Sequence, residues 1–155
     1  MPATRTFRTL LLAAFLSIPV AAHAQSEAPA STPKSPAKKP AVYDEAADGK
    51  VQVEQALARA RKENRRVLIQ WGANWCGWCI RLHALTSTDR EVKRLLDYEY
   101  DLVHIDVGQF NKHMDLAAKH GADLKAHGLP YLTILDADGK LLAHHETGSL
   151  ELPKD

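Results

Sequence analysis

The feature that most constrains this chain is a pair of cysteines three residues apart, Cys76 and Cys79, which closely follows a short apolar segment. They are the only cysteines among 155 residues. A disulfide between them would close almost no loop, so it would add little stability by restricting the unfolded chain. Two cysteines are also too few for a fold held together by disulfides. The pair therefore indicates a chemical rather than a structural role for these two cysteines.

The residues around the cysteines have the pattern of a strand followed by a helix. Residues 67–71 form an apolar run with β-branched residues, which is typical of a buried central strand. After a short turn, Leu82 and Leu85 recur at helical spacing. We therefore expect Cys76 where a strand ends and a helix begins.

Apolar spacing and capping residues predict three further helices, at 50–64, 90–97 and 109–120. The second is expected to begin after the N-cap Asp89, and the third to end at Gly121. The apolar side of the second helix is formed by Val92, Leu95 and Leu96.

Strands are predicted at 101–107, 131–135 and 140–145. Asp138-Gly139 separates the last two, which is typical of an antiparallel hairpin. Helices that alternate with strands and are followed by a hairpin predict an α/β fold with a central mixed β-sheet and helices on both faces. The functional crevice of such a sheet lies beyond the carboxyl ends of its parallel strands, where Cys76 is expected.

Residues 1–24 have the organisation of a secretory signal peptide. Arg5 and Arg8 precede an apolar run over 10–20, and Ala22-His23-Ala24 forms a small-residue cleavage site. The alternative is a membrane anchor, but the run is shorter than the ~20 residues that a span requires. We expect cleavage after residue 24 and delivery to an oxidising compartment.

Residues 25–42 are rich in Pro, Ala, Ser and Lys and hold four of the eight prolines. Such a composition cannot form a packed core, so we expect a disordered linker that acts as a spacer. All eight glycines lie in 43–155, where the single globular domain is expected. The chain has 20 basic and 19 acidic residues and only 6% aromatic residues, which argues against nucleic-acid binding.

At Cys76-Gly77-Trp78-Cys79 the sequence resembles the thioredoxin superfamily, and the resemblance extends over most of 50–148. The active-site and cis-proline signatures of the superfamily are matched in order and spacing by Trp71, Trp75 and Gly128-Leu129-Pro130-Tyr131. The pattern is most similar to that of secreted bacterial proteins of the thiol-disulfide interchange type. The resemblance implies a thioredoxin-like fold, a redox-active Cys76–Cys79 disulfide and no cofactor.

The two cysteines are expected to have different roles. A cysteine at the N-terminal end of a helix faces unpaired amides and the positive end of the helix dipole, which favour the thiolate. Cys76 is therefore the predicted nucleophile. Cys79, one turn further along, is the predicted resolving cysteine, which attacks the mixed disulfide and releases the substrate.

The resemblance also implies a substrate-binding surface. It places a cis peptide bond before Pro130 and the backbone of Leu129 against the substrate chain, although an ordinary trans proline in a turn is the alternative. Trp75, Gly77 and Trp78 would surround the reactive sulfur and suit unfolded or apolar peptide segments. Each tryptophan could instead simply pack on the domain.

Two positions depart from thioredoxins. Gln70 stands where thioredoxins place a buried acid, and an amide cannot act as a proton acceptor. The proton relay for Cys79 must then come from water or another group, or the protein works in a direction that needs less help from a proton acceptor. Trp78 stands where reducing thioredoxins carry proline. The residues between the cysteines tune the redox potential, so this difference weakens an assignment to the strongly reducing thioredoxins.

Metal binding is a competing hypothesis. Cys76, Cys79 and His83 would form only part of a zinc site, which normally has four ligands. Haem attachment is excluded, because Ile80 follows the second cysteine where a histidine is needed. The other candidate ligands are His113, His120 and His127, spaced by seven, and the pair His144-His145. We expect these to be solvated or capping histidines rather than metal ligands, and His83 to tune a thiolate or point to solvent.

The superfamily normally adds a last helix against the sheet after the hairpin, and the sequence up to Asp155 lacks it. We expect that the sequence is incomplete; the alternative is a sheet face left partly bare, as a partner surface or a source of instability.

The sequence thus predicts a periplasmic thiol-disulfide oxidoreductase, a reductase or isomerase rather than an oxidase. Its expected partners are cysteine-containing secreted proteins and a membrane thiol-disulfide reductase, without nucleic acid or stable membrane insertion after signal cleavage. One alternative is a copper- or zinc-binding delivery module that uses the cysteines and histidines. Another is a non-catalytic thioredoxin-like interaction domain, against which the intact cysteine pair and Pro130 argue.

Overall fold

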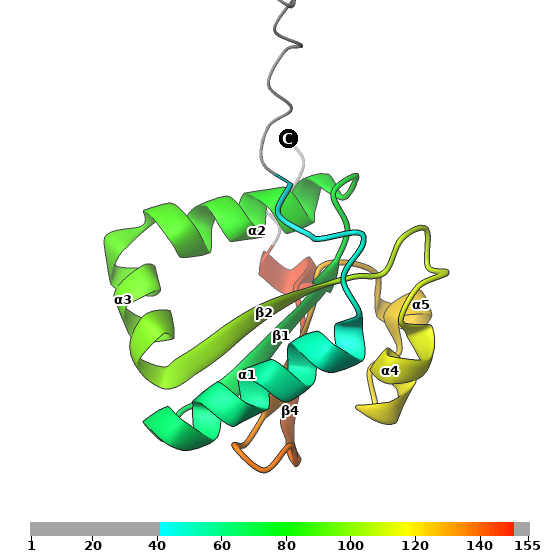
Figure 1. Cartoon of the computed structure of the whole chain (residues 1–155). Coiled ribbons are helices and arrows are strands. Elements are labelled where there is room, and N and C mark those ends of the chain that lie inside the picture. The colour runs from blue at the N-terminus through cyan, green and yellow to red at the C-terminus, as the bar shows by residue number, and fades with distance from the viewer. Residues whose placement is uncertain (1–40, 151–155) are drawn as a thin grey trace, which may run out of the picture. The chain divides into compact units, whose positions relative to one another are not determined.

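The computed structural model describes residues 41–150, in which helices alternate with strands before a final hairpin (Figure 1). The predicted signal peptide and all but the last two residues of the predicted linker lie outside the described residues. The elements are, in order, α1 Gly49–Glu63, β1 Arg66–Gly72, α2 Gly77–Thr88, α3 Arg90–Glu99, β2 Tyr100–Asp106, α4 Met114–Lys119, α5 Leu124–His127, β3 Tyr131–Leu135, β4 Leu141–Glu146 and a 3₁₀ turn Gly148–Leu150.

The four strands form one mixed sheet in the order β2-β1-β3-β4. β2 runs parallel to β1, whereas β3 is antiparallel to β1 and to β4. The register pairs Gly72 with Asp106 across the parallel strands and Trp71 with Tyr131 across the antiparallel pair. The predicted mixed sheet is confirmed, and its two parallel strands end side by side next to the cysteines.

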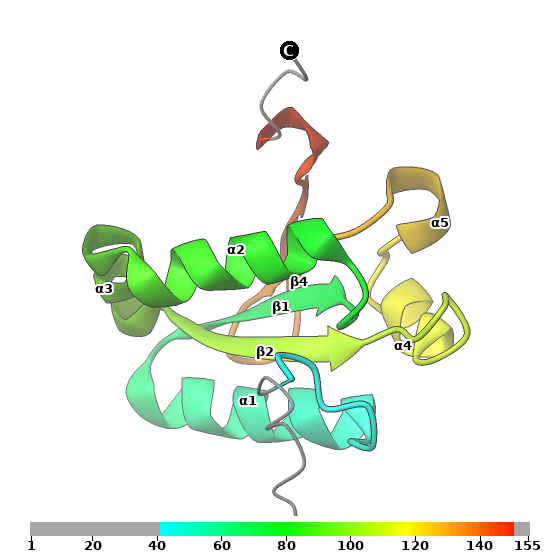
Figure 2. The ribbon, with the colours of Figure 1, turned by 90° about the horizontal axis from the view of Figure 1, so that it is seen from above.

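Helices cover both faces of the sheet, with α1 on one side and α2 on the other (Figure 2). Successive side chains of β1 point to opposite faces, so Val67, Ile69 and Trp71 pack into the core with α1. Gln70 points the other way, toward α2. β1 is buried on both faces, which explains its continuous apolar sequence.

The predicted starts of two helices are matched by side-chain caps. Asp48 accepts hydrogen bonds from the amides of Lys50 and Val51 at the start of α1. Asp89 accepts from the amides of Glu91 and Val92 at the start of α3, as its predicted N-cap role requires.

The predicted apolar side of α3 is only partly correct. Val92 and Leu96 are half-buried, but Leu95 is 59% exposed. α3 packs mainly against α2 and β2, so only a narrow stripe of the helix surface is covered by these two elements. Leu95 lies outside that stripe.

The predicted helix over 109–120 is wrong in its first half, because residues 107–113 form turns and α4 begins at Met114. Gly108, Phe110 and His113 have φ values of 54°, 59° and 53°, in the left-handed region. The side chain of Asn111 also accepts a hydrogen bond from the amide of Gln109, which competes with helical bonding. Gly121 follows the end of α4, as predicted.

The hairpin is confirmed. Asp136 Oδ1 accepts hydrogen bonds from the amides of Asp138 and Lys140, and Gly139 adopts a φ of 85° in the turn. The segment in which the sequence lacks a last helix, Glu146 to Asp155, is described only as far as Leu150, and Gly148–Leu150 there form a 3₁₀ turn. Within residues 41–150, no helix is both long enough and apolar enough to cross a membrane.

Candidate active site

Cys76 and Cys79 are joined by a disulfide at the N-terminus of α2, with their Cα atoms 5.2 Å apart. A short turn connects this point to the end of β1. Cys76 is the N-cap of α2, and its Sγ accepts a hydrogen bond from the amide of Cys79 at 3.1 Å. The same amide and the positive end of the helix dipole are available to stabilise a thiolate on Cys76 once the disulfide opens.

The two sulfurs differ in their access to solvent. Cys76 is 6% exposed, whereas Cys79 is completely buried. An incoming sulfur can therefore approach Cys76 from outside but cannot reach Cys79. This asymmetry agrees with the roles predicted for the two residues, the outer cysteine as nucleophile and the inner one as resolving group.

Leu129 and Pro130 lie beside the disulfide, although they are far from it in the sequence. The peptide bond between them is cis. Leu129 packs both against the disulfide cluster and against the main core, and the carbonyl of Pro130 accepts a hydrogen bond from Thr147 Oγ1 at 2.7 Å. Next to this segment is a largely apolar cavity of about 130 Å³, lined by Trp78, Arg81, Leu82, Leu85, Pro130, Thr147 and Leu150.

The predicted substrate-binding residues before and between the cysteines have different environments. Trp75 is half-exposed, and its indole N–H donates to the carbonyl of Gly108 at 2.7 Å, so it also fixes the turn after β2. Trp78 packs against the disulfide cluster, with the guanidinium of Arg81 4.7 Å from its ring centre. Gly77 has open space where a Cβ would stand. An extended peptide could lie across this surface.

Gln70 lies directly behind the disulfide, where the resemblance to thioredoxins implies an acid. Its side chain is buried, and its Nε2 donates to the carbonyl of Cys79 at 3.2 Å and to Tyr43 Oη at 2.7 Å. The amide thus connects the inner cysteine to a tyrosine that precedes α1.

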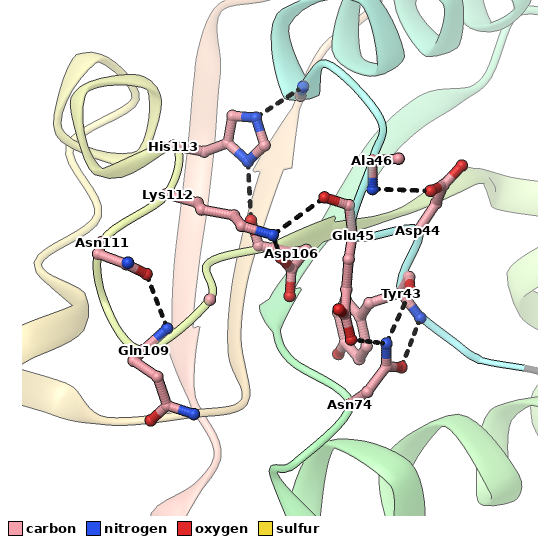
Figure 3. A network of polar contacts seen from close by, with 12 residues as sticks. Tyr43, Asp44, Glu45, Ala46, Asn74, Asp106, Gln109, Asn111, Lys112 and His113 are labelled. Atoms are coloured by element: carbon pink, nitrogen blue, oxygen red, sulfur yellow. Dashed lines mark hydrogen bonds and ion pairs between the residues drawn. The ribbon is translucent and has the colours of Figure 1, made fainter.

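Tyr43 is a site residue that sequence analysis missed. It is completely buried and packs against both cysteines. Asn74 holds its backbone by two hydrogen bonds, from Tyr43 N to Asn74 Oδ1 at 3.0 Å and from Asn74 Nδ2 to Tyr43 O at 2.8 Å (Figure 3). Burial raises the pKa of the Tyr43 phenol well above its ordinary value. A single aromatic residue at the end of a proline-rich segment carries no periodic signal that would have revealed this position.

A second polar group ties the segment before α1 to the turn after β2 (Figure 3). Asp106 is buried at the end of β2, and its Oδ2 pairs with Lys112 Nζ at 3.0 Å. Lys112 also donates to the carbonyl of Glu45 at 3.0 Å. These contacts hold the segment that carries Tyr43 against the end of the sheet.

The imidazole of His113 caps α1. Its Nε2 accepts a hydrogen bond from the amide of Gly49 at 3.1 Å, and its Nδ1 lies 2.7 Å from the carbonyl of Asp106. A carbonyl only accepts and an amide only donates, so the proton of the neutral ring is on Nδ1. The expectation of a capping histidine is met at this position, although the capped helix is α1 and not α4.

Residues 48–137 match a family model described as thioredoxin-like. This match covers more than half of the chain and includes β1, the cysteine pair and the cis-proline. The chain belongs to the thioredoxin-like family. The structure thus confirms the resemblance on which the sequence prediction rested, and the described residues form a thioredoxin-like thiol-disulfide oxidoreductase domain with an oxidised Cys76–Cys79 pair.

Two relatives illustrate the similarity. The chain is 32% identical to a disulphide isomerase from Xylella fastidiosa Temecula1, whose crystal structure superposes with a TM-score of 0.65 over 70% of this chain and 82% of the other. It is 28% identical over 94 residues to the disulfide bond reductase DsbH of Chlamydia pneumoniae. That match covers 57% of this chain and 57% of the length of DsbH.

The remaining histidines do not assemble into a metal site within residues 41–150, where no three His, Cys, Asp or Glu side chains are grouped to hold an ion. His120 follows α4, and His127 stacks on Tyr131 with ring centres 5.6 Å apart. His144 Nδ1 contacts Thr133 Oγ1 at 3.2 Å. His83, one turn beyond Cys79, lies with its Nδ1 3.3 Å from His104 Nε2.

The half-buried imidazole of His104 should make stability depend on pH. Burial, followed by the nearby charge of His83, lowers the pKa of His104 to about 4. Between pH 6.5 and 4 the imidazole of His104 binds a proton in the unfolded chain but not in the native protein. The free energy of unfolding should therefore fall by up to about 3 kcal/mol as the pH is lowered through this window. Below it, the contribution of His104 should change no further.

Urea unfolding of the wild type and a His104→Asn variant at intervals from pH 7.5 to 5 measures this effect. The variant should lose part of the pH dependence over that range. Equal pH slopes for the two proteins would contradict the assignment to His104.

Proposed function

We propose that this protein is a periplasmic thiol-disulfide oxidoreductase that reduces or isomerises disulfides in secreted proteins. The observation that carries the proposal is the Cys76–Cys79 disulfide at the start of α2, beside the cis Leu129–Pro130 bond. The secretory signal predicted for residues 1–24 supports the location. The names of the two relatives, a disulphide isomerase and a disulfide bond reductase, support the direction.

The partial accessibility of Cys76, in contrast to the completely buried Cys79, suggests the order of the steps. The Cys76 thiolate attacks a substrate disulfide, forms a bond to one substrate sulfur and expels the other as a thiolate. The Cys79 thiolate then attacks Cys76 Sγ, expels the second substrate thiolate and closes the Cys76–Cys79 disulfide. Two electrons pass to the substrate, and the oxidised protein remains, as in this structure.

The proposed partners follow from these reaction steps. The substrates are cysteine-containing secreted proteins, which would lie across Trp78 and the Leu129–Pro130 segment. The cavity beside Trp78 and Pro130 is largely apolar, which suits unfolded segments with exposed apolar side chains. In an oxidising compartment the Cys76–Cys79 disulfide must be reduced again, and a membrane thiol-disulfide reductase is the proposed source of electrons.

A redox titration tests the direction of exchange. The purified protein is equilibrated with glutathione buffers, free thiols are trapped, and the oxidised fraction gives the reduction potential of the Cys76–Cys79 pair. We expect a potential closer to the ~−270 mV of thioredoxin than to the ~−120 mV of a strong periplasmic oxidant.

Two other outcomes would contradict the proposal. A potential near the oxidant value would make the protein a disulfide donor. Failure to form the disulfide, together with stoichiometric copper or zinc in the purified protein, would instead favour the metal-delivery alternative. No specific observation favours that alternative here, since the two sulfurs are bonded to each other.

A further inference from the structure

The hydroxyl group of Tyr43 carries a hydrogen that has no acceptor among the described residues. Gln70 Nε2 contacts the carbonyl of Cys79, which can only accept, so the orientation of the amide is settled. The same Nε2 therefore donates to Tyr43 Oη at 2.7 Å. The phenol oxygen is the acceptor in this bond, so the hydroxyl hydrogen remains free to donate to another group.

The sulfur of Cys79 borders the same space as this hydroxyl, and no hydrogen bond joins the two in the oxidised protein. A Cβ built on Gly72 would overlap Tyr43 Oη and would lie 2.9 Å from Cys79 Sγ, so the oxygen and the sulfur border the same small space. Both residues are completely buried in one cluster. Gly72 leaves this space open, because a side chain there would overlap both the phenol and the sulfur.

We propose that the Tyr43 hydroxyl donates a hydrogen bond to the Cys79 thiolate whenever the disulfide opens, and that Gln70 is the residue that positions it. The inference deepens the exchange reaction proposed above and rests on it. When an external thiolate attacks Cys76 Sγ, a new S–S bond forms, the Cys76–Cys79 bond breaks, and the electron pair leaves on Cys79 Sγ. The hydroxyl stabilises that buried anion, which otherwise has no solvent around it.

The charges around Tyr43 favour a hydrogen bond over proton transfer. Burial and the carboxylate of Asp106 raise the pKa of the phenol, so its proton stays on oxygen. Lys112 pairs with Asp106 at 3.0 Å. His104, with His83 behind it, meets the edge of the Tyr43 ring, and the lowered pKa of His104 keeps that ring neutral at pH 7. The hydroxyl is thus a donor that remains protonated throughout the reaction.

The arrangement explains how the site works with an amide where thioredoxins carry an acid. A buried carboxylate in the place of Gln70 would accept the phenol hydrogen and withdraw it from Cys79. The Gln70 amide does the opposite, because one of its N–H groups donates to the phenol oxygen and leaves the phenol hydrogen free for sulfur.

A Tyr43→Phe variant tests the proposal, with Tyr98→Phe as the matched control, since Tyr98 is 78% exposed on α3. In the reduced proteins, the ¹³Cβ NMR shift of Cys79 is followed against pH. A hydrogen bond to a charged group is strong enough that its loss should raise the pKa of Cys79 by about one to two units. The control should titrate like the wild type.

Stopped-flow reduction of the oxidised proteins by dithiothreitol gives an independent measurement. Cys79 is the leaving group in this reaction, and a less acidic thiol leaves more slowly, so Tyr43→Phe should react about three- to tenfold more slowly than the wild type. Unchanged pKa and rate in a folded Tyr43→Phe protein would overturn the proposal. If the wild type itself is not reduced by dithiothreitol, the proposed function fails as well, so the two failures are distinguishable.

A measurement on the wild type keeps the proposal testable if the variant does not fold. The Tyr43 hydroxyl proton should move downfield in the NMR spectrum as Cys79 deprotonates, with the same midpoint as the Cys79 ¹³Cβ shift. A hydroxyl resonance that does not respond to the Cys79 titration would rule out the donor role.

Discussion

A Cys76→Ser variant should lose disulfide reductase activity, with turnover of insulin by dithiothreitol falling to the rate of the reaction without protein. Cys76 is the sulfur that an external group can reach, whereas Cys79 is completely buried under Tyr43 and the start of α2. Serine keeps the size of the side chain and its N-cap position but supplies no thiolate nucleophile at neutral pH. The variant should therefore fold normally and be inactive.

Cys79→Ser is the informative partner of that variant. It should also lose turnover, but it keeps the Cys76 nucleophile and removes only the group that resolves the mixed disulfide. Mass spectrometry should detect a stable covalent adduct of Cys79→Ser with a disulfide-containing substrate and no adduct of Cys76→Ser. Adducts formed instead by Cys76→Ser would reverse the assignment of the two cysteines.

Truncation of Trp71 should cause the largest loss of stability that a single substitution at this site can produce. Trp71 on β1 is completely buried in the core, and its indole N–H donates to Thr133 Oγ1 on β3 at 2.9 Å. Trp71→Ala should lower the free energy of unfolding by about 3–5 kcal/mol, because it leaves a cavity that the surrounding residues cannot fill. Urea unfolding followed by circular dichroism measures the change.

Trp71→Phe separates packing from hydrogen bonding. It keeps most of the aromatic volume but removes the indole donor, while Thr133 retains its contact with His144. We expect a loss of about 1–2 kcal/mol. Equal losses for the two variants would show that the hydrogen bond, rather than the filled volume, accounts for the stability that Trp71 provides.

The chemistry of the site depends on the side chains around Cys79 as well as on the two cysteines themselves. Gln70 from β1 and Tyr43 from the segment before α1 meet behind Cys79, and the absence of a side chain at Gly72 leaves room for them. The Asp106–Lys112 pair and the Asn74 amide hold that segment in place. Mutations in the turn at 107–113 are therefore expected to act on the active site through Tyr43.

Much of this protein is determined by patterns between neighbouring residues. The apolar run before Cys76, the N-cap Asp89 and the Asp138-Gly139 turn each act within a few residues, because helices, caps and hairpin turns depend on local spacing and local hydrogen bonds. For that reason the order of the four strands and the position of Cys76 at the start of a helix are evident without a structure, whereas the short helix α5 is not predicted. The cysteine spacing and Pro130 likewise indicate the family.

The tertiary structure decided what depends on distant segments meeting. The helix predicted from Gln109 was displaced by left-handed turns that Trp75 and Lys112 hold against the site. Tyr43 has no local signal, and it became a site residue only because α1, β1 and β2 bring its ring beneath Cys79. Burial, the direction of a hydrogen bond and the closeness of a hydroxyl to a sulfur are properties of the packed chain, since each depends on residues that come together only when the sheet and its helices assemble.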